Sequence, residues 1–266
     1  MVLREITSRE NPAVKEYVRL AGSRKARRET GRFVTEGVKL TAEAFNAGCT
    51  PRAAYVTEEA FKRYDVLTKL AEKGLELVGI SSSVAAKLAQ SPSPQGVFGV
   101  FSMLDNQTQP VKIGSNGKFL LLSSLQDPGN LGTILRTAAA FGVDGVFLSD
   151  DCPDLYSLKV LRASMGGVFK VPSAVCGDLD GIIAALRQEK VPVWAAALCE
   201  GAAPVSKAKL AGGCAVVIGN EGNGLAKEMI DQCDGAVIIP MRPDSESLNA
   251  AMAAGILVWE MTRDRL

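Results

Sequence analysis

Short, wholly apolar runs recur in the second half of the chain with helix-like stretches between them, and this alternation restricts the fold more than any other feature. Residues 119–122, 193–197 and 215–219 are apolar throughout and lack the polar-apolar alternation of a strand with one wet face. Such runs are typical of parallel strands covered on both faces. Strand and helix in turn predict an α/β domain with a mostly parallel sheet.

The length of the chain, 266 residues, suits two domains better than one. The first half also alternates between short strands and helices. Between the halves, residues 105–110 read Asp-Asn-Gln-Thr-Gln-Pro, a polar stretch with the turn-forming residues of a linker. We therefore expect one domain over residues 1–104, a linker over residues 105–111 and a larger domain over residues 112–266.

The chain contains no histidine, and this limits its chemistry. A Ser-His-Asp triad, a Cys-His pair and a histidine general base are all excluded. The cysteines include no CxxC pair, so we expect no metal site and interpret the thiols as small buried hydrophobes. The six cysteines are Cys49, Cys152, Cys176, Cys199, Cys214 and Cys233.

No segment has the length and apolar character of a membrane span. The apolar run 250–259 has ten residues, whereas a spanning helix needs about 20. The first residues, Met-Val-Leu-Arg-Glu, lack the apolar stretch of a secretory signal. We therefore expect a cytoplasmic protein.

Positive charge is concentrated at the start of the chain. Residues 1–39 hold ten Lys and Arg against five Asp and Glu, although the whole chain has a net charge of only +1. The densest part contains Arg24, Lys25, Arg27 and Arg28. Such a cluster neutralises phosphates and releases counterions when it binds RNA. The alternative interpretation is a solvated helix face.

Three loops that follow predicted strands of the second half hold most of its glycine, asparagine and proline, and ligands bind at such strand ends in open α/β sheets. The first loop covers residues 126–136. Asn130 is a candidate N-cap of the helix that follows, and Arg136 projects from the next turn. A helix N-terminus and an arginine both favour phosphate. The alternative is an ordinary capped helix with a surface arginine.

The second loop covers residues 217–225 and contains three glycines within six residues, beginning at Gly219. Its spacing is GxxGxG, which differs from the dinucleotide-binding GxGxxG and from a Walker A loop. A tight turn accounts for the glycines. It does not account for Glu221 or for the two asparagines beside them.

The third loop covers residues 238–249, in which Pro240 and Pro243 restrict the path after a strand. Ser247 is a candidate N-cap, with Asn249 in the first helical turn. The helix that follows, over residues 250–259, is apolar on every side and is expected to be buried all round. It is either a core helix alone or a core helix that also packs against a partner subunit.

Taken in order, these motifs resemble those of the SpoU (TrmH-type) RNA methyltransferases of the SPOUT superfamily. The resemblance rests on Asp-Pro-x-Asn-x-Gly-x-x-x-Arg from residue 127, Gly-Asn-Glu-Gly-x-Gly-Leu from residue 219, and Ile-Pro-Met and Glu-Ser-Leu-Asn from residues 239 and 246. Arg-Ala-Ser-Met-Gly-Gly from residue 162 is similar to that family too. The first half contributes Ile-Thr-Ser from residue 6, Asn-Pro at residue 11, Phe-Val-Thr-Glu-Gly from residue 33 and Pro-Gln-Gly-Val from residue 94.

The resemblance implies the fold, the cofactor and the partners. It implies a C-terminal α/β trefoil-knot methyltransferase domain, preceded by a smaller ribosomal-protein-like domain that binds the RNA substrate. The cofactor is S-adenosylmethionine, and the methyl group goes to a ribose 2′-hydroxyl. Ribosomal RNA is favoured over transfer RNA as the substrate, and a homodimer forms through the C-terminal domain.

The resemblance also implies roles for individual residues. Arg162 joins the basic run as an RNA-binding candidate. The cofactor-binding candidates are Gly219, Ile239, Met241, Leu248 and Ala197. The catalytic candidates are Arg136, Asn130, Glu221, Ser247 and Asn249.

Arg136 is the matching residue that the family is thought to use for the hydroxyl proton. Arginine has a pKa above about 12 and is a poor base. We therefore expect Arg136 to grip a phosphate and to lower the pKa of the hydroxyl. A phosphate oxygen, or Arg136 after transient deprotonation, then takes the proton. The stretch from Arg242 to Asp244 is more charged and stiffer than the glycine-containing family version, which bears on the cofactor contacts.

Two alternatives compete with this function. One is a non-catalytic RNA-binding or ribosome-assembly factor with the same fold, against which the intact Asn130, Arg136, Glu221 and Asn249 argue. The other is a nucleotide-dependent α/β oxidoreductase, against which the glycine spacing argues. Methyl transfer to a base rather than to a ribose stays open.

Overall fold

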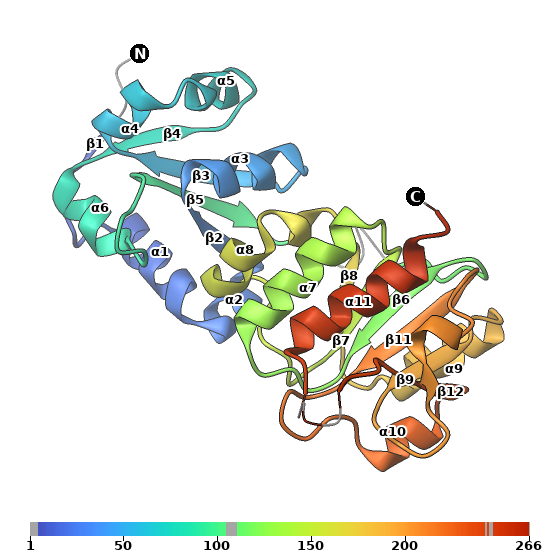
Figure 1. Cartoon of the computed structure of the whole chain (residues 1–266). Coiled ribbons are helices and arrows are strands. Elements are labelled where there is room, and N and C mark those ends of the chain that lie inside the picture. Colours follow the sequence, from blue (N-terminus) through green and yellow to red (C-terminus); the bar gives the residue numbers. More distant parts are fainter. Residues whose placement is uncertain (1–4, 105–110, 243, 245–246, 266) are drawn as a thin grey trace. The chain divides into compact units, whose positions relative to one another are not determined.

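The computed structural model describes residues 5–104, 111–242, 244 and 247–265 (Figure 1). The chain divides into two compact units. Unit 1 comprises Met1–Leu104 and Asp154–Phe169, and unit 2 comprises Asp105–Pro153 and Lys170–Leu266. Residues 154–169 thus pack with unit 1, although the expected boundary placed them in the second domain. Residues 105–110 of the expected linker lie outside the described residues.

Unit 1 contains a mixed five-stranded sheet in the order β1-β4-β3-β5-β2. Strands β1, β4 and β3 run parallel, and β5 pairs antiparallel with both β3 and β2. The strands are β1 (Glu5–Ile6), β2 (Arg32–Glu36), β3 (Pro51–Val56), β4 (Leu77–Ile80) and β5 (Val97–Ser102).

The helices of unit 1 begin where the sequence supplies caps. Asn11 accepts a hydrogen bond from the amide of Ala13, with proline at the first helical position. Ser23 ends one helix and caps the next. The helices are α1 (Pro12–Gly22), α2 (Arg24–Thr30), α3 (Val38–Asn46), α4 (Glu58–Arg63), α5 (Val66–Glu72), α6 (Ser82–Leu88) and α8 (Leu158–Ser164), with a 3₁₀ turn η1 (Gly167–Phe169).

Unit 2 contains a seven-stranded sheet in the order β10-β12-β9-β11-β6-β7-β8, in which every pairing is parallel. The expected α/β domain with a parallel sheet is confirmed, and the central strands β6 and β11 are buried along their whole length. The strands are β6 (Lys118–Leu122), β7 (Gly145–Ser149), β8 (Ser173–Cys176), β9 (Val193–Ala196), β10 (Ala203–Pro204), β11 (Cys214–Ile218) and β12 (Gly235–Ile238).

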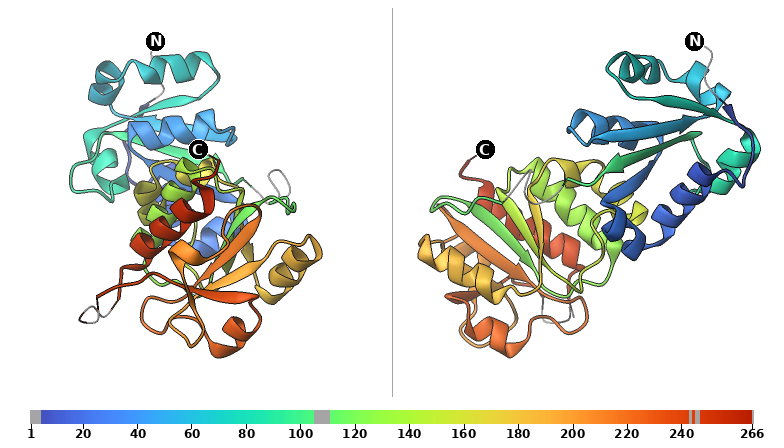
Figure 2. Two further views of the ribbon diagram at one scale, coloured as in Figure 1. Left: turned by 45° about the vertical axis from the view of Figure 1, so that its right-hand side comes forward. Right: turned by 180° about the vertical axis from the view of Figure 1, so that it is seen from behind.

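Helices cover both faces of this sheet, as its apolar strands require. Helices α7 (Pro128–Ala140) and α11 (Ala250–Thr262) lie side by side on one face (Figure 1). Helix α9 (Asp180–Gln188) lies on the other face (Figure 2). Its buried side chains pack against those of β6 and β11. The remaining elements are α10 (Lys227–Asp231) and a 3₁₀ turn η2 (Val205–Lys207). The knotted chain path that the resemblance implies stays a prediction.

Two elements differ from what the sequence predicts. Residues 168–171, Val-Phe-Lys-Val, favour a strand by their composition, but residues 167–169 form the turn η1, in which Phe169 packs against the ring of Phe33. Within its own chain, helix α11 is not buried all round. Met252, Ile256 and Trp259 are exposed on one of its faces.

Within the described residues, no helix is long and apolar enough to cross a membrane. No group of three or more His, Cys, Asp or Glu side chains in this part of the chain could hold a metal ion. All six cysteines are described and carry free thiols. Burial is the main cause that raises the pKa of Cys49 to about 12 and that of Cys214 to about 11, so both thiols stay protonated.

Candidate active site

Two neighbouring strands bring two of the three loops together. Strands β6 and β11 pair in register up to Leu122 and Ile218, so the residues that follow emerge at the same edge of the sheet. The amide of Ser123 continues this pairing with a hydrogen bond of 2.9 Å to the carbonyl of Ile218. The third loop leads into α11, which packs beside α7 on this sheet.

A chain of side-chain hydrogen bonds joins all three loops. The carboxylate of Glu221 accepts from the backbone amides of Gln126 (2.9 Å) and Asp127 (3.1 Å) and from Nδ2 of Asn130 (3.0 Å). Oδ1 of Asn130 accepts in turn from Nδ2 of Asn249, at 2.9 Å. The structure therefore brings Asn130, Glu221 and Asn249 into one network.

Helix capping determines which way the two amides point. Oδ1 of Asn249 accepts from the backbone amides of Ala251 and Met252, at 2.9 and 3.3 Å. Nδ2 of Asn249 is thus left to face Asn130, and the amide of Asn130 must turn its own Nδ2 toward Glu221. The positive N-terminal end of α11 and the carboxylate of Glu221 thus lie at opposite ends of this series of hydrogen bonds.

Both predicted N-caps were wrong. Asp127 caps α7 by accepting from the amide of Asn130, because Pro128 takes the first helical position. Asn249 rather than Ser247 caps α11. Because Asp127 is the cap, Asn130 lies in the first turn of α7 and its side chain bonds to Glu221 and Asn249.

Glu221 is held as a carboxylate. Partial burial opposes its ionisation, but the hydrogen bonds from Asn130, Asp127 and Gln126 outweigh that effect and lower its pKa below the ordinary value. A carboxylate that already accepts three hydrogen bonds is a weak proton acceptor. Glu221 therefore positions its neighbours rather than serving as a base.

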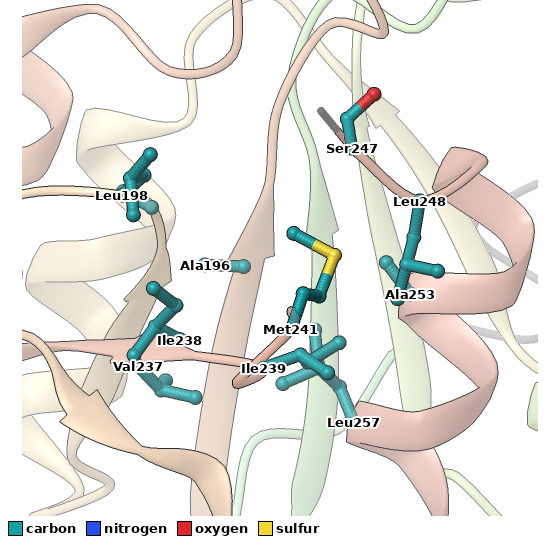
Figure 3. Close-up of a pocket in the computed structure, with 11 residues that line it drawn as sticks. Ala196, Leu198, Val237, Ile238, Ile239, Met241, Ser247, Leu248, Ala253 and Leu257 are labelled. Atoms are coloured by element: carbon teal, nitrogen blue, oxygen red, sulfur yellow. The ribbon is translucent and has the colours of Figure 1, made fainter. Parts of the chain in front are cut away.

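Two cavities adjoin this network and share Ser247 and Leu248 in their walls. The first has a volume of about 200 Å³ and lies between the ends of β9 and β12 and the start of α11. Figure 3 shows the side chain of Met241 between the strand side and the helix side of this cavity. Its walls are apolar. They are formed by Ala196, Ala197, Leu198, Val237, Ile238, Ile239, Met241, Ser247, Leu248, Ala253 and Leu257.

The second cavity has a volume of about 420 Å³ and polar walls. Asn130, Glu221 and Asn249 line it, so the amides of the network face this space. The side chain at Ser247 belongs to both cavities. An apolar cavity thus opens beside one lined with hydrogen-bonding groups, an arrangement suited to a ligand with an apolar ring and a polar substrate next to it.

The predicted cofactor residues divide into two groups. Ala197, Ile239, Met241 and Leu248 line the apolar cavity. Gly219 does not line either cavity as the described residues define them. A Cβ at this position would lie 2.4 Å from the backbone of Gly224, so glycine is needed here for the tight loop closure.

Arg136 lies on the exposed side of α7 and lines neither cavity of its own chain, as far as the structure describes them. Among the described residues it has no hydrogen bond or ion pair. Its guanidinium is therefore available to a ligand. The structure does not bring it into the network of Asn130, Glu221 and Asn249.

The basic candidates in unit 1 also divide. Lys25 and Arg28 are exposed on α2, and Arg24 is half-buried. Arg27 is only 4% exposed, and its guanidinium lies 2.6 Å from the carboxylate of Asp154 and donates to backbone carbonyls of α1. This corrects the expectation that Arg27 contacts RNA, because its donors are already used inside the unit.

Arg162 lies on α8, within unit 1. Its guanidinium is 3.5 Å from the buried carboxylate of Glu36, and the side chain keeps about two fifths of its surface exposed. The same carboxylate accepts from the backbone amides of Gln90 and Ser91, at 3.0 Å each. Arg162 is thus anchored at one edge and open to solvent at the other.

Sequence reasoning missed three residues beside the site. Ser124, Ser149 and Asn220 form hydrogen bonds that connect the loops after β6, β7 and β11. Asn220 had a signal, since a tight turn does not explain its presence in the glycine-rich loop. Ser124 and Ser149 had none, because ordinary serines after strands carry no mark of their partners.

Family comparisons agree with this geometry over most of the chain. A model of the SpoU rRNA methylase family matches residues 117–259, which include all three loops. A model of the MRM3-like substrate binding domain matches residues 11–99.

Individual proteins are similar over a greater length. The 23S rRNA (guanosine(2553)-2′-O)-methyltransferase RlmP of Bacillus subtilis strain 168 is 32% identical, covering 97% of this chain and 99% of that protein. The human mitochondrial rRNA methyltransferase 3 is 29% identical, covering 91% of this chain and 70% of that protein. The crystal structure of an AdoMet-bound rRNA methyltransferase from Sinorhizobium meliloti has a TM-score of 0.87 at 30% identity and covers 99% of both chains.

Proposed function

The chain belongs to the SpoU rRNA methylase family, and on that premise we propose that it transfers a methyl group from S-adenosylmethionine to a ribose 2′-hydroxyl of ribosomal RNA. The observation that carries this proposal is the network of Asn130, Glu221 and Asn249 beside an apolar cavity. The printed activity of the Bacillus relative and the AdoMet bound to the Sinorhizobium structure support it.

The apolar cavity fits the cofactor by its chemistry. Ala197, Ile239 and Leu248 offer apolar walls to an adenine ring, and strand-end backbone around Ile239 offers paired N–H and C=O groups. When bound, the cofactor supplies a methyl group on a positively charged sulfonium. The protein's own task is to hold a ribose oxygen in line with that group, and such orientation supplies roughly 7–11 kcal/mol in favourable cases.

The amides of the network suit a ribose or phosphate oxygen in the polar cavity. Each side-chain amide nitrogen carries two N–H donors, and the described network uses one from Asn130 and one from Asn249. The second donor of each is free to meet an acceptor. Glu221 and the N-terminus of α11 hold both amides in the required orientation.

Arg136 supplies positive charge and a planar donor fork. In this proposal it binds the phosphate next to the target ribose and lowers the pKa of the 2′-hydroxyl. The proton then passes to a phosphate oxygen of the RNA, or to Arg136 after transient deprotonation. Glu221 is not the acceptor, because its lowered pKa and three donors favour the charged form.

The partners of the protein follow from each unit separately. We propose that Lys25, Arg28, Arg24 and Arg162 contact RNA phosphates. The match of residues 11–99 to a substrate-binding domain supports the first three, and Arg162 belongs to the same unit. We propose a homodimer through the exposed face of α11, in which one chain's Arg136 completes the polar cavity of its partner. Cytoplasmic location stays a prediction, since similar proteins include a mitochondrial one.

The test uses the purified full chain, ribosomal RNA transcripts and S-adenosylmethionine with a labelled methyl group. We expect methylated nucleotides that resist alkaline cleavage, and a fall in kcat of about 100-fold for Arg136→Ala. Arg136→Lys keeps the charge but loses the fork, so we expect an intermediate rate.

Arg187→Ala, on α9 on the opposite face of the sheet, is the control and should leave kcat unchanged. Near-wild-type turnover of Arg136→Ala would refute the assigned role. Label in a base instead of a ribose would refute ribose methylation and assign the methyl acceptor to the base. No heat on calorimetric titration with S-adenosylmethionine, together with retained RNA binding, would point to a non-catalytic binding factor.

A further inference from the structure

Ser124 adopts a backbone conformation that side chains rarely take. Its φ is +56°, in the left-handed region, at the second residue after β6. A residue other than glycine keeps this conformation only where surrounding contacts hold it, and such residues gather at functional sites. The contacts around Ser124 are therefore informative about what the turn is for.

Three side chains hold the backbone of Ser124. Its amide donates to Oγ of Ser149 at 2.8 Å, and its carbonyl accepts from Nδ2 of Asn220 at 2.8 Å and from Nε2 of Gln126, in the same loop, at 3.1 Å. Oγ of Ser149 donates its only proton to the carboxylate of Asp151, so it must act as an acceptor toward Ser124. Both groups of Ser124 are thus committed to neighbouring loops.

The turn at Ser124 determines where the Glu221 site is built. Gln126 and Asp127 follow it by two and three residues, and their amides donate to the Glu221 carboxylate. Asp127 also caps α7, which carries Asn130 and Arg136. A different φ at Ser124 would redirect the chain before all of these groups.

Asn220 ties the same two loops together from the other side. Its Oδ1 accepts from the amides of Gly222 and Asn223, which shapes its own loop, while its Nδ2 reaches across to Ser124. Asn220 immediately precedes Glu221 in sequence. One side chain therefore both closes the glycine-rich loop and fixes its distance from the turn.

We propose that Ser124 is a positioning residue for methyl transfer, held in its left-handed conformation by Ser149 and Asn220 so that Glu221 and the first turn of α7 are aligned. This inference rests on the proposed function. Asn220 lines the polar cavity, but its side-chain groups bond to Ser124, Gly222 and Asn223. The effect of the three residues passes through Glu221, Asn130 and Arg136.

The decisive variant is Asn220→Asp. Aspartate keeps an oxygen for the amides of Gly222 and Asn223 but has no donor for the carbonyl of Ser124, which is left with the hydrogen bond from Nε2 of Gln126 within its own loop and with none from the glycine-rich loop. We expect kcat to fall by about 10- to 100-fold, as for a small misplacement of reacting groups. We expect the KM for RNA, the Kd for S-adenosylmethionine and the thermal midpoint to change little.

Asn223→Asp is the matched control, because it adds the same charge to the same loop without touching Ser124. We expect its kcat to stay within about twofold of wild type. A second variant, Ser124→Gly in the Asn220→Asp background, tests whether the loss of kcat comes from the left-handed conformation at residue 124. Glycine takes a positive φ without strain, so it should restore most of the lost kcat.

Hydrogen exchange of residues 124–132 measures the stability of the turn independently of enzyme activity. The amides of this segment should exchange faster in Asn220→Asp and at the wild-type rate in Asn223→Asp. Equal exchange in both variants, equal kcat, or a joint loss of kcat and cofactor binding would overturn the inference. An inactive wild type with the expected exchange pattern would refute the proposed function alone.

Discussion

At the level of single side chains, the site leaves each polar group one arrangement. The amides of Asn130 and Asn249 are oriented by a helix end on one side and a carboxylate on the other. Glu221 must stay ionised for this to hold, because a protonated carboxyl would present a donor toward three donors. The charge state of one residue therefore organises the whole polar cavity.

The variant Glu221→Gln tests this dependence through stability. At pH 7 we expect the free energy of unfolding of unit 2 to drop by about 1 kcal/mol, at the low end for charged hydrogen bonds because the side chain is exposed. The folded pKa lies below the ordinary value of 4.5. The stabilisation is thus complete above that value and is lost as the pH falls through the folded pKa.

Urea denaturation at a series of pH values measures this difference. Tryptophan fluorescence reports on unit 2, because Trp194 and Trp259 both lie there. The two proteins should converge in stability below about pH 4.5. Glu72→Gln, at an exposed position of α5, is the control and should not alter the transition. A constant gap at all pH values would contradict the assignment.

Helix α11 contributes to the site at its N-terminus, packs on α7 along one side and exposes an apolar face. Its N-terminus carries Asn249 into the polar network, and one side packs on α7, where the rings of Trp259 and Phe141 meet edge to face with centroids 5.7 Å apart. Met252, Ile256 and Trp259 follow one another at helical spacing on its exposed face, with Met252 61% exposed. Such a stripe is typical of a surface that another molecule covers.

Replacing Met252 and Ile256 together with Glu should abolish the dimer proposed through this face. Two carboxylates facing their counterparts across a twofold interface would be desolvated without partners, which is strongly unfavourable. Sedimentation should show a dimer for wild type at micromolar concentration and a monomer for the variant. Gln188→Glu, at the exposed end of α9, should leave the dimer intact. A monomeric wild type would refute the interface.

For the chain as a whole, the two units are not consecutive pieces of sequence. Residues Asp154–Phe169 leave unit 2 and pack into unit 1 before the chain returns. Leu158 joins the core around Val14 and Tyr17, and the ring of Tyr156 lies 4.8 Å from that of Phe33. The buried ion pair between Arg27 and Asp154 also holds this segment in unit 1.

Asp154→Ala should therefore loosen unit 1, although the substituted residue follows about 50 residues of unit 2. Leaving the Arg27 guanidinium buried without its carboxylate costs about 3–5 kcal/mol. Hydrogen exchange should rise in α1 and β2 and stay unchanged in α11. The double change Arg27→Met with Asp154→Leu should cost much less, because it removes both charges. Unchanged hydrogen exchange in α1 and β2 would show that the Asp154 carboxylate is not needed for the stability of unit 1.

The sequence alone determined most strands of the parallel sheet and the three loops that form the site. Apolar runs without alternation are enough to predict a parallel sheet, because only a strand buried on both faces needs them. Glycine, asparagine and proline at strand ends marked the loops that later met. The motif resemblance implied the fold, the cofactor class and the activity, and the family comparisons support all three.

Only the tertiary structure decided which side chains are exposed and which polar groups pair with one another. Arg27 and Arg28 are neighbours in one basic run, yet Arg27 is buried against a carboxylate 127 residues away and Arg28 is exposed. Asn130 was expected to cap a helix and instead joins Glu221 and Asn249, partners 91 and 119 residues distant. Local sequence specifies backbone preferences and burial patterns, but the partner of a polar group is chosen by packing across the fold.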